Sequence, residues 1–218
     1  AAAGMAAPNA HRFLASFVRA GLAVQDAATA RYDLGPLALR IGLAALQRAD
    51  PIAAVQRALP ALVTEVGVTA IVVVWSERGP TIVHWQRSAP AFASALALGS
   101  LLPATGSASG RVLLAGMDER VAAREIAARH RAADERRAVA AAVARVRADG
   151  WAGVSGTVIP GLAALAAPLR DAQGVVLAAV TLIGPATDGD DWPARLAPRL
   201  LAFCREAAPA AAPATSSG

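Results

Sequence analysis

The sequence predicts an α+β protein that starts with a short helical and two-stranded segment and continues into a larger mixed domain. Apolar residues recur at helical spacing over 8–21, and two short strand-like runs follow. Further along, the β-branched run 69–75 and its neighbour 81–86 have the pattern of a buried hairpin. Three more strand-like runs come after a helical region, so strands and helices are largely segregated along the chain.

Residues 1–35 have the pattern of the later part of a winged helix-turn-helix. Pro8 suits the first turn of a helix, where its missing N–H is not needed, and Gly21 suits the position just past the helix end. A strand, a turn and a return strand would then form the wing, over 22–24, 26–30 and 31–34. Because a helix-turn-helix has a supporting first helix, we expect this domain to be incomplete at its N-terminus.

A linker helix is predicted over 36–50. Its apolar residues recur at roughly helical spacing and form a stripe that is more apolar than one small domain can bury. These residues are Leu37, Ile41, Ala44 and Leu46. The pair Asp50-Pro51 ends the helix, because the residue before a proline disfavours the α conformation.

The larger domain is predicted over 51–206. It opens with a helix over 52–66, and the later elements are separated by turns rich in Gly, Ser, Asp and Pro. The predicted strands cover 69–75, 81–86, 151–154, 162–169 and 175–183. The predicted helices cover 105–115, 118–128, 134–149 and 192–206. Alanine, proline and serine dominate 207–218, so we expect a disordered tail there.

Composition narrows the classes of protein to consider. The formal net charge is +5, and all 21 basic residues are arginine. Arginine usage beside so much alanine favours a bias in the coding sequence over a nucleic-acid-binding tract. The longest apolar runs, such as 175–184, are about half the length that a membrane span needs. With no visible signal peptide and the single Cys204 in a helical pattern, we expect a soluble cytoplasmic protein without a membrane partner.

No catalytic or metal-binding constellation is visible. The run GSASG over 106–110 has Ala108 where a nucleophile elbow needs serine, and a usual P-loop is impossible without lysine. His11, His84 and His130 are scattered, with no cysteine or acid at metal-ligand spacing. The sequence therefore predicts no catalytic residue, no metal and no cofactor.

Four stretches together resemble the IclR family of bacterial transcriptional regulators. The stretch GMAAPNAHRFLASFVRAGL matches the end of the family's second helix and its recognition helix. The stretch RYDLGPLALRIG matches the end of the wing and the start of the linker. A family pattern close to LP-hAtasGkalLA is matched by LPATGSASGRVLLAG over 102–116. A second pattern, near Gv-aiAaPv-d--G-vvaalsv-gP, is matched by GLAALAAPLRDAQGVVLAAVTLIGP over 161–185. The stretches follow the family's order and spacing over nearly the whole chain.

The resemblance implies an N-terminal winged helix that binds double-stranded DNA and a C-terminal effector-binding domain. That domain would be GAF-like, with a curved antiparallel sheet flanked by helices. The resemblance also implies a homodimer or dimer of dimers on a palindromic operator, controlling a metabolic operon in response to a carboxylic or aromatic acid. Two rivals stay open: a stand-alone small-molecule sensor that no longer binds DNA, motivated by the incomplete helix-turn-helix, and a weaker one, an enzyme on a GAF-like fold.

Three positions depart from patterns seen in the family. Many members have a glutamate where this chain has Thr157. The glyoxylate-type pocket has an acidic residue at the position that matches Val154 and a cysteine at the position that matches Ala164. Because both positions are apolar here, the sequence favours an apolar or aromatic effector over a small, very polar one.

Candidate DNA contacts cluster on one face of the first helix and on the wing. Arg12 can bind phosphate or guanine edges, and Asn9 can hydrogen-bond to adenine, although either could instead be a solvated side chain or a helix cap. We expect Arg31 on the wing to reach the DNA backbone or minor groove. The full set is Ala7, Asn9, His11, Arg12, Ser16 and Arg31.

Candidate effector contacts follow from a helix start and from the family's pocket positions. The amides of Ala108 and Ser109 lie where a helix begins, which favours an anion, although an ordinary capping serine is the alternative. Thr181 and Ile183 alternate on the last strand and so face one side, with plain core as the alternative for Ile183. The full set is Ala108, Ser109, Val154, Ala164, Thr181 and Ile183.

Overall fold

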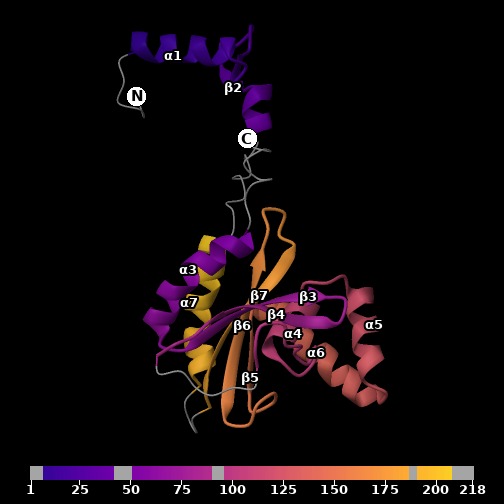
Figure 1. Cartoon of the computed structure of the whole chain (residues 1–218). Coiled ribbons are helices and arrows are strands. Elements are labelled where there is room, and N and C mark those ends of the chain that lie inside the picture. The colour runs from indigo at the N-terminus through magenta and orange to yellow at the C-terminus, as the bar shows by residue number, and fades with distance from the viewer. Residues whose placement is uncertain (1–6, 42–50, 90–95, 187–190, 208–218) are drawn as a thin grey trace. The chain divides into compact units, whose positions relative to one another are not determined.

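The computed structural model describes residues 7–41, 51–89, 96–186 and 191–207, with no side-chain description for Ala7 and Pro8. By its internal contacts the chain divides into two compact units, Ala1–Asp50 and Pro51–Gly218. Each unit is described by itself (Figure 1).

The N-terminal unit has one helix followed by a two-stranded antiparallel wing. Its elements are α1 (Ala7–Arg19), β1 (Ala23–Gln25) and β2 (Tyr32–Leu34). The wing turn is held by Asp26, whose Oδ1 accepts the N–H groups of Ala28 and Thr29 at 2.8 and 2.9 Å. These two bonds stabilise the carboxylate and lower the pKa of Asp26. Residues 36–41 are helical, and the rest of the predicted linker helix lies outside the described residues.

The C-terminal unit is built on a five-stranded antiparallel sheet in the order β4-β3-β7-β6-β5. The strands β3 and β7, which are far apart in the sequence, pair at its centre, and β4 and β5 are its edge strands. The strands are β3 (Thr69–Ser76), β4 (Gly79–Gln86), β5 (Ala152–Ser155), β6 (Leu162–Arg170) and β7 (Val176–Pro185). This architecture confirms the predicted α+β class with a sheet flanked by helices (Figure 1).

One face of the sheet is covered by α3 (Pro51–Val66) and α7 (Trp192–Ala207), which lie side by side in Figure 1. Leu59, Leu165 and Leu200 belong to the core between these helices and the sheet, and each is completely buried. Outside this core, Arg199 of α7 donates two hydrogen bonds of 2.7 Å to the carboxylate of Glu65 in α3. Burial in the core raises the pKa of the Cys204 thiol to about 12, as expected for an unreactive core cysteine.

The opposite face carries α4 (Ala108–Ala115), α5 (Glu119–Arg129) and α6 (Ala133–Asp149). Helix α4 packs directly on the sheet, with Val112 and Leu113 against Ile71 and Ala179 in one cluster. Helix α5 packs outside it through a smaller cluster around Leu114 and Ile126. Successive side chains of each strand therefore point alternately into the two cores, one on each face of the sheet.

Several predicted boundaries were wrong by one to three residues. The helix predicted from Thr105 begins at Ala108, because residues 104–106 form a turn and the Ser107 side chain caps the helix. The hairpin turn predicted through Pro80 is shorter, since Gly79 already pairs with Ser76. Gly79 has φ +115°, a conformation that favours glycine and lets the chain reverse early.

Candidate ligand-binding site

An inner pocket lies between the start of α4 and the sheet face beneath it. Its walls come from α4, from β3, β5, β6 and β7, and from the turn between β5 and β6. All six residues that the sequence nominated for effector contact line this pocket, although they come from four separate stretches of the chain. They are Ala108, Ser109, Val154, Ala164, Thr181 and Ile183.

The sheet side of the inner pocket is a row of paired residues. Val154 pairs with Ala164 between β5 and β6, and Ala164 pairs with Ile183 between β6 and β7. Directly paired residues in a sheet point to the same side, so these three side chains form a continuous apolar floor. Thr181 lies two residues before Ile183 and therefore faces the same way, next to this row.

The helix side of the inner pocket presents free backbone donors. The Ser107 hydroxyl donates to the Pro103 carbonyl at 2.7 Å and accepts the Gly110 N–H at 3.0 Å. Among the described residues, the N–H groups of Ala108 and Ser109 have no hydrogen-bond partner. Free N–H groups at a helix start, with the helix dipole behind them, favour a negatively charged group.

Gly110 fixes the position of this helix start. A methyl group at Gly110 would lie 2.2 Å from the carbonyl oxygen and 2.6 Å from the carbonyl carbon of Ala104. Only glycine allows the helix to approach the preceding turn this closely. This close packing therefore fixes the position of the Ala108 and Ser109 amides relative to the sheet.

The hydroxyls of Ser109 and Thr181 form a buried pair inside the inner pocket. Their oxygens are 2.8 Å apart, and each residue is only 1% exposed. One hydroxyl donates its proton to the other in this bond. The proton of the accepting hydroxyl therefore remains available to a further acceptor. Thr181 therefore holds the Ser109 side chain as well as lining the inner pocket.

We expect Thr181→Val to lower the free energy of unfolding by about 1–3 kcal/mol, because the Ser109 hydroxyl would stay buried without its partner. Urea unfolding followed by circular dichroism measures the change. The double variant Ser109→Ala/Thr181→Val removes both hydroxyls and should recover much of the loss. Strict additivity of the two single changes would show that the hydroxyls do not stabilise one another.

Further lining residues were not nominated from the sequence. They are Ile71, Leu96, Leu102, Ser107, Thr157, Val158, Ile159, Leu162 and Ala163. Strand alternation could have found Ile71, which pairs with Thr181. The family comparison had singled out Thr157, but nothing pointed to Val158 and Ile159, because periodicity does not show where a turn folds back.

The inner pocket is small as it stands. Its volume is about 40 Å³, far below the roughly 300–1,000 Å³ of typical ligand sites. The turn that closes it is flanked by Gly156 and Gly161, at φ +67° and +78°. A ligand larger than a few atoms therefore needs this turn to move outward.

In the N-terminal unit, the candidate DNA contacts differ in their exposure. Asn9, His11 and Arg12 on α1, and Arg31 before β2, are exposed. Ser16 is half-buried, and its hydroxyl donates to the Arg12 carbonyl at 3.0 Å and accepts from Arg19 at 3.2 Å. Those two bonds already engage Ser16, whereas the four exposed side chains are accessible to a partner.

The position of Asn9 in α1 and the exposure of the apolar face of α1 both bear on the candidate DNA contacts. Ala7 is the first residue of α1, so Asn9 lies within the helix and does not occupy the N-cap position. The apolar face opposite the polar residues is only partly covered by the described residues, since Phe13 is 50% and Phe17 44% exposed.

Comparison with known proteins places these features in a family. The model of the family described as bacterial transcriptional regulator IclR C-terminal matches residues 43–208. The chain belongs to the IclR family.

Relatives of this IclR-family protein are regulators of transcription rather than enzymes. It is 31% identical to the Pca regulon regulatory protein of Pseudomonas putida over 89% of this chain and 69% of that protein. It is 30% identical to the glycerol operon regulatory protein of Streptomyces griseus over 84% of this chain and 73% of that protein. The crystal structure of Pseudomonas aeruginosa HmgR has a TM-score of 0.77 and 37% identity, over 94% of this chain and 84% of that one.

The described part of this IclR-family chain contains neither a membrane-spanning helix nor a cluster of metal-binding side chains. Within the described residues, no helix is both long and apolar enough to cross a membrane. Nor do the side chains in the described part of the chain gather three or more histidine, cysteine or acidic groups that could hold a metal ion.

Proposed function

We propose that this protein is an effector-responsive repressor or activator in which residues 1–35 bind an operator and the inner pocket of the C-terminal unit binds a small organic acid. The observation that carries the proposal is that all six residues nominated for effector contact line one pocket, beside two free amides. The relatives named for the glycerol operon and the Pca regulon support control of a metabolic operon.

The pocket chemistry supports a carboxylic or aromatic acid as the effector. The amides of Ala108 and Ser109 are suited to a carboxylate, and one hydroxyl proton of the Ser109–Thr181 pair is suited to a second acceptor. Val154, Ala164 and Ile183 offer an apolar surface to the rest of the molecule. Ligand pockets commonly measure roughly 300–1,000 Å³, so binding an aromatic ring would open the turn over 156–161.

Effector binding would act by shifting an equilibrium between two arrangements of the DNA-binding units. A ligand changes such an equilibrium only by the difference between its affinities for the two states. In the proposed mechanism that difference comes from the turn over 156–161, which would be closed without ligand and open with it. A homodimer or dimer of dimers on a palindromic site would convert the change into loss or gain of operator binding.

We expect the intact protein to select a palindromic sequence from a random DNA library, with an affinity that falls steeply as salt rises. Arg12→Ala should weaken that binding by roughly 1–3 kcal/mol if Arg12 contacts a base. Fluorescence anisotropy on the selected site measures both effects. Arg124→Ala is the matched control, since Arg124 is an exposed arginine on α5 of the other unit.

Failure of this experiment would be informative. If selection with the intact protein returns no enriched sequence, the DNA-binding proposal is wrong and the stand-alone sensor becomes the better description. If Arg124→Ala weakens binding as much as Arg12→Ala, the loss reflects general charge and not a contact by α1.

A further inference from the structure

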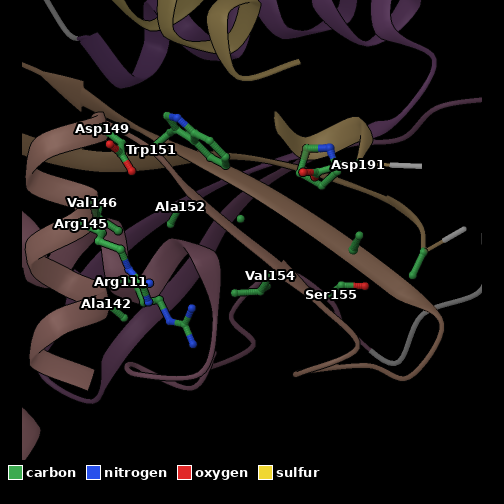
Figure 2. Close-up of a pocket in the computed structure, with 14 residues that line it drawn as sticks. Arg111, Ala142, Arg145, Val146, Asp149, Trp151, Ala152, Val154, Ser155 and Asp191 are labelled. Carbon is green, nitrogen blue, oxygen red and sulfur yellow. The ribbon is translucent and has the colours of Figure 1, made fainter. Parts of the chain in front are cut away.

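A second, larger cavity lies along the free edge of β5, with a volume of about 380 Å³ (Figure 2). Helices α4 and α6 form one wall, β5 forms the floor, and the start of α7 closes the far end. Val154 and Ala163 line both this outer cavity and the inner pocket, so the two spaces are neighbours separated by β5 and β6 side chains. The outer cavity falls in the size range of small-molecule sites.

The floor of the outer cavity offers unpaired backbone groups. Gly156 donates its N–H to the Leu162 carbonyl at 2.8 Å. This bond shows which residue pairs between β5 and β6 are the hydrogen-bonded ones. Hydrogen-bonded pairs alternate along an antiparallel ladder, so Gly153 and Ser155 turn their N–H and C=O groups away from β6. Both residues line the cavity, where no described strand pairs with them.

Two arginines stand at one end of the outer cavity. Arg111 on α4 and Arg145 on α6 lie near one another in Figure 2, and the carboxylates of Asp149 and Asp191 also line the cavity. Among the described residues, neither guanidinium forms an ion pair with a carboxylate. Two neighbouring positive charges that form no ion pair with the carboxylates of the cavity favour a bound anion.

Arg111 is positioned and not merely solvated. Its Nε donates to the Thr105 carbonyl at 2.9 Å, and the Thr105 hydroxyl is 2.8 Å from Nε2 of His130. This anchor leaves the two terminal nitrogens of the guanidinium to face the cavity. Burial, and then the charge of Arg145, lower the pKa of Arg111, and a bound anion would relieve the second effect.

We propose that the outer cavity is a second ligand site, in which Arg111 and Arg145 hold the carboxylate or phosphate group of a small organic anion. Arginine suits both groups, because its planar fork of N–H donors matches their oxygens. Trp151, Val154 and Pro193 would contact the apolar part of the ligand. The site is distinct from the inner pocket, whose proposed anion-binding groups are the amides of α4.

The test uses the intact protein with labelled arginine Nε groups, titrated to millimolar concentration with benzoate, benzamide and inorganic phosphate. Benzoate or phosphate should shift the Arg111 and Arg145 signals, whereas the neutral benzamide should not. Arg111→Gln and Arg145→Gln should each weaken the affinity about tenfold, the loss expected for one charge-assisted interaction. Arg137→Gln removes the same charge from an exposed position of α6 and should leave the affinity unchanged.

The outcomes separate this site from the inner pocket. The inner-pocket variant Ala164→Phe should retain anion binding in the outer cavity, because Ala164 does not line that cavity. Loss of the anion-induced shifts in that variant would overturn the claim of a separate site. The proposal also fails if neither anion shifts Arg111 or Arg145, or if Arg137→Gln weakens binding as much as Arg145→Gln. Arg145 is exposed, so its replacement keeps the test valid even if Arg111→Gln folds poorly.

Discussion

Ala164→Phe is expected to abolish effector binding in the inner pocket while the protein still folds. Ala164 is the middle residue of the apolar floor, between Val154 and Ile183. A phenyl ring there occupies the roughly 40 Å³ of free space and keeps the turn over 156–161 from admitting a ligand. Overpacking of this kind typically destabilises a protein by about 1–3 kcal/mol, which still permits folding.

Calorimetric titration with benzoate, in a background that carries Arg111→Gln and Arg145→Gln to remove binding in the outer cavity, measures the loss in the inner pocket. Thermal unfolding confirms the fold of the variant. Ala128→Phe, at an exposed position of α5, is the control for adding an aromatic ring. Ala164→Val is a milder version that should weaken binding without a strong effect on stability. If folded Ala164→Phe binds the ligand as tightly as the parent protein, the effector site lies elsewhere.

Gly110→Ala is expected to lower the free energy of unfolding by about 1–3 kcal/mol or more. Its Cβ would lie 2.2 Å from the Ala104 carbonyl oxygen, and the atoms in the way are backbone atoms that cannot rotate aside. Relief of this contact must move the start of α4, so the amides of Ala108 and Ser109 would no longer face the sheet correctly. Ligand affinity should therefore fall together with stability.

Gly106→Ala is the matched control within the same turn. Its Cβ would meet only the Pro103 Cβ at 3.4 Å, an ordinary contact, and Gly106 is absent from the positive-φ glycines of the described chain. Chemical denaturation of both variants gives the comparison. Equal destabilisation at the two positions would show that turn flexibility, and not the close approach of Gly110, is what matters.

The sequence allowed good prediction of which segments form helices and strands in the C-terminal unit. The apolar runs over 162–169 and 175–183 predicted the two strands β6 and β7, and Gly174 donates its N–H to the Asp171 carbonyl in the turn between them. The start of α4 was misplaced by three residues, because a cap depends on where the Ser107 side chain finds its partner. Local pattern therefore located the elements better than their ends.

The candidate site could be predicted only in part. Resemblance to family motifs led to Ala108, Ser109 and Thr181, but nothing in their spacing shows that the two hydroxyls meet across 72 residues. The closing turn with Val158 and Ile159, and the pairing of Arg111 with Arg145, were not found at all. These features depend on contacts between segments that the sequence separates.

The amino-acid sequence by itself determined the α+β class, the family and the shared face of Thr181 and Ile183. Tertiary structure alone decided the strand order, in which β3 pairs with β7 and β5 becomes an edge strand beside Arg111 and Arg145. The physical reason is that periodicity records which side of a segment is buried, whereas the identity of its neighbour depends on long-range packing. The inner pocket and the outer cavity both arise from that choice of neighbours.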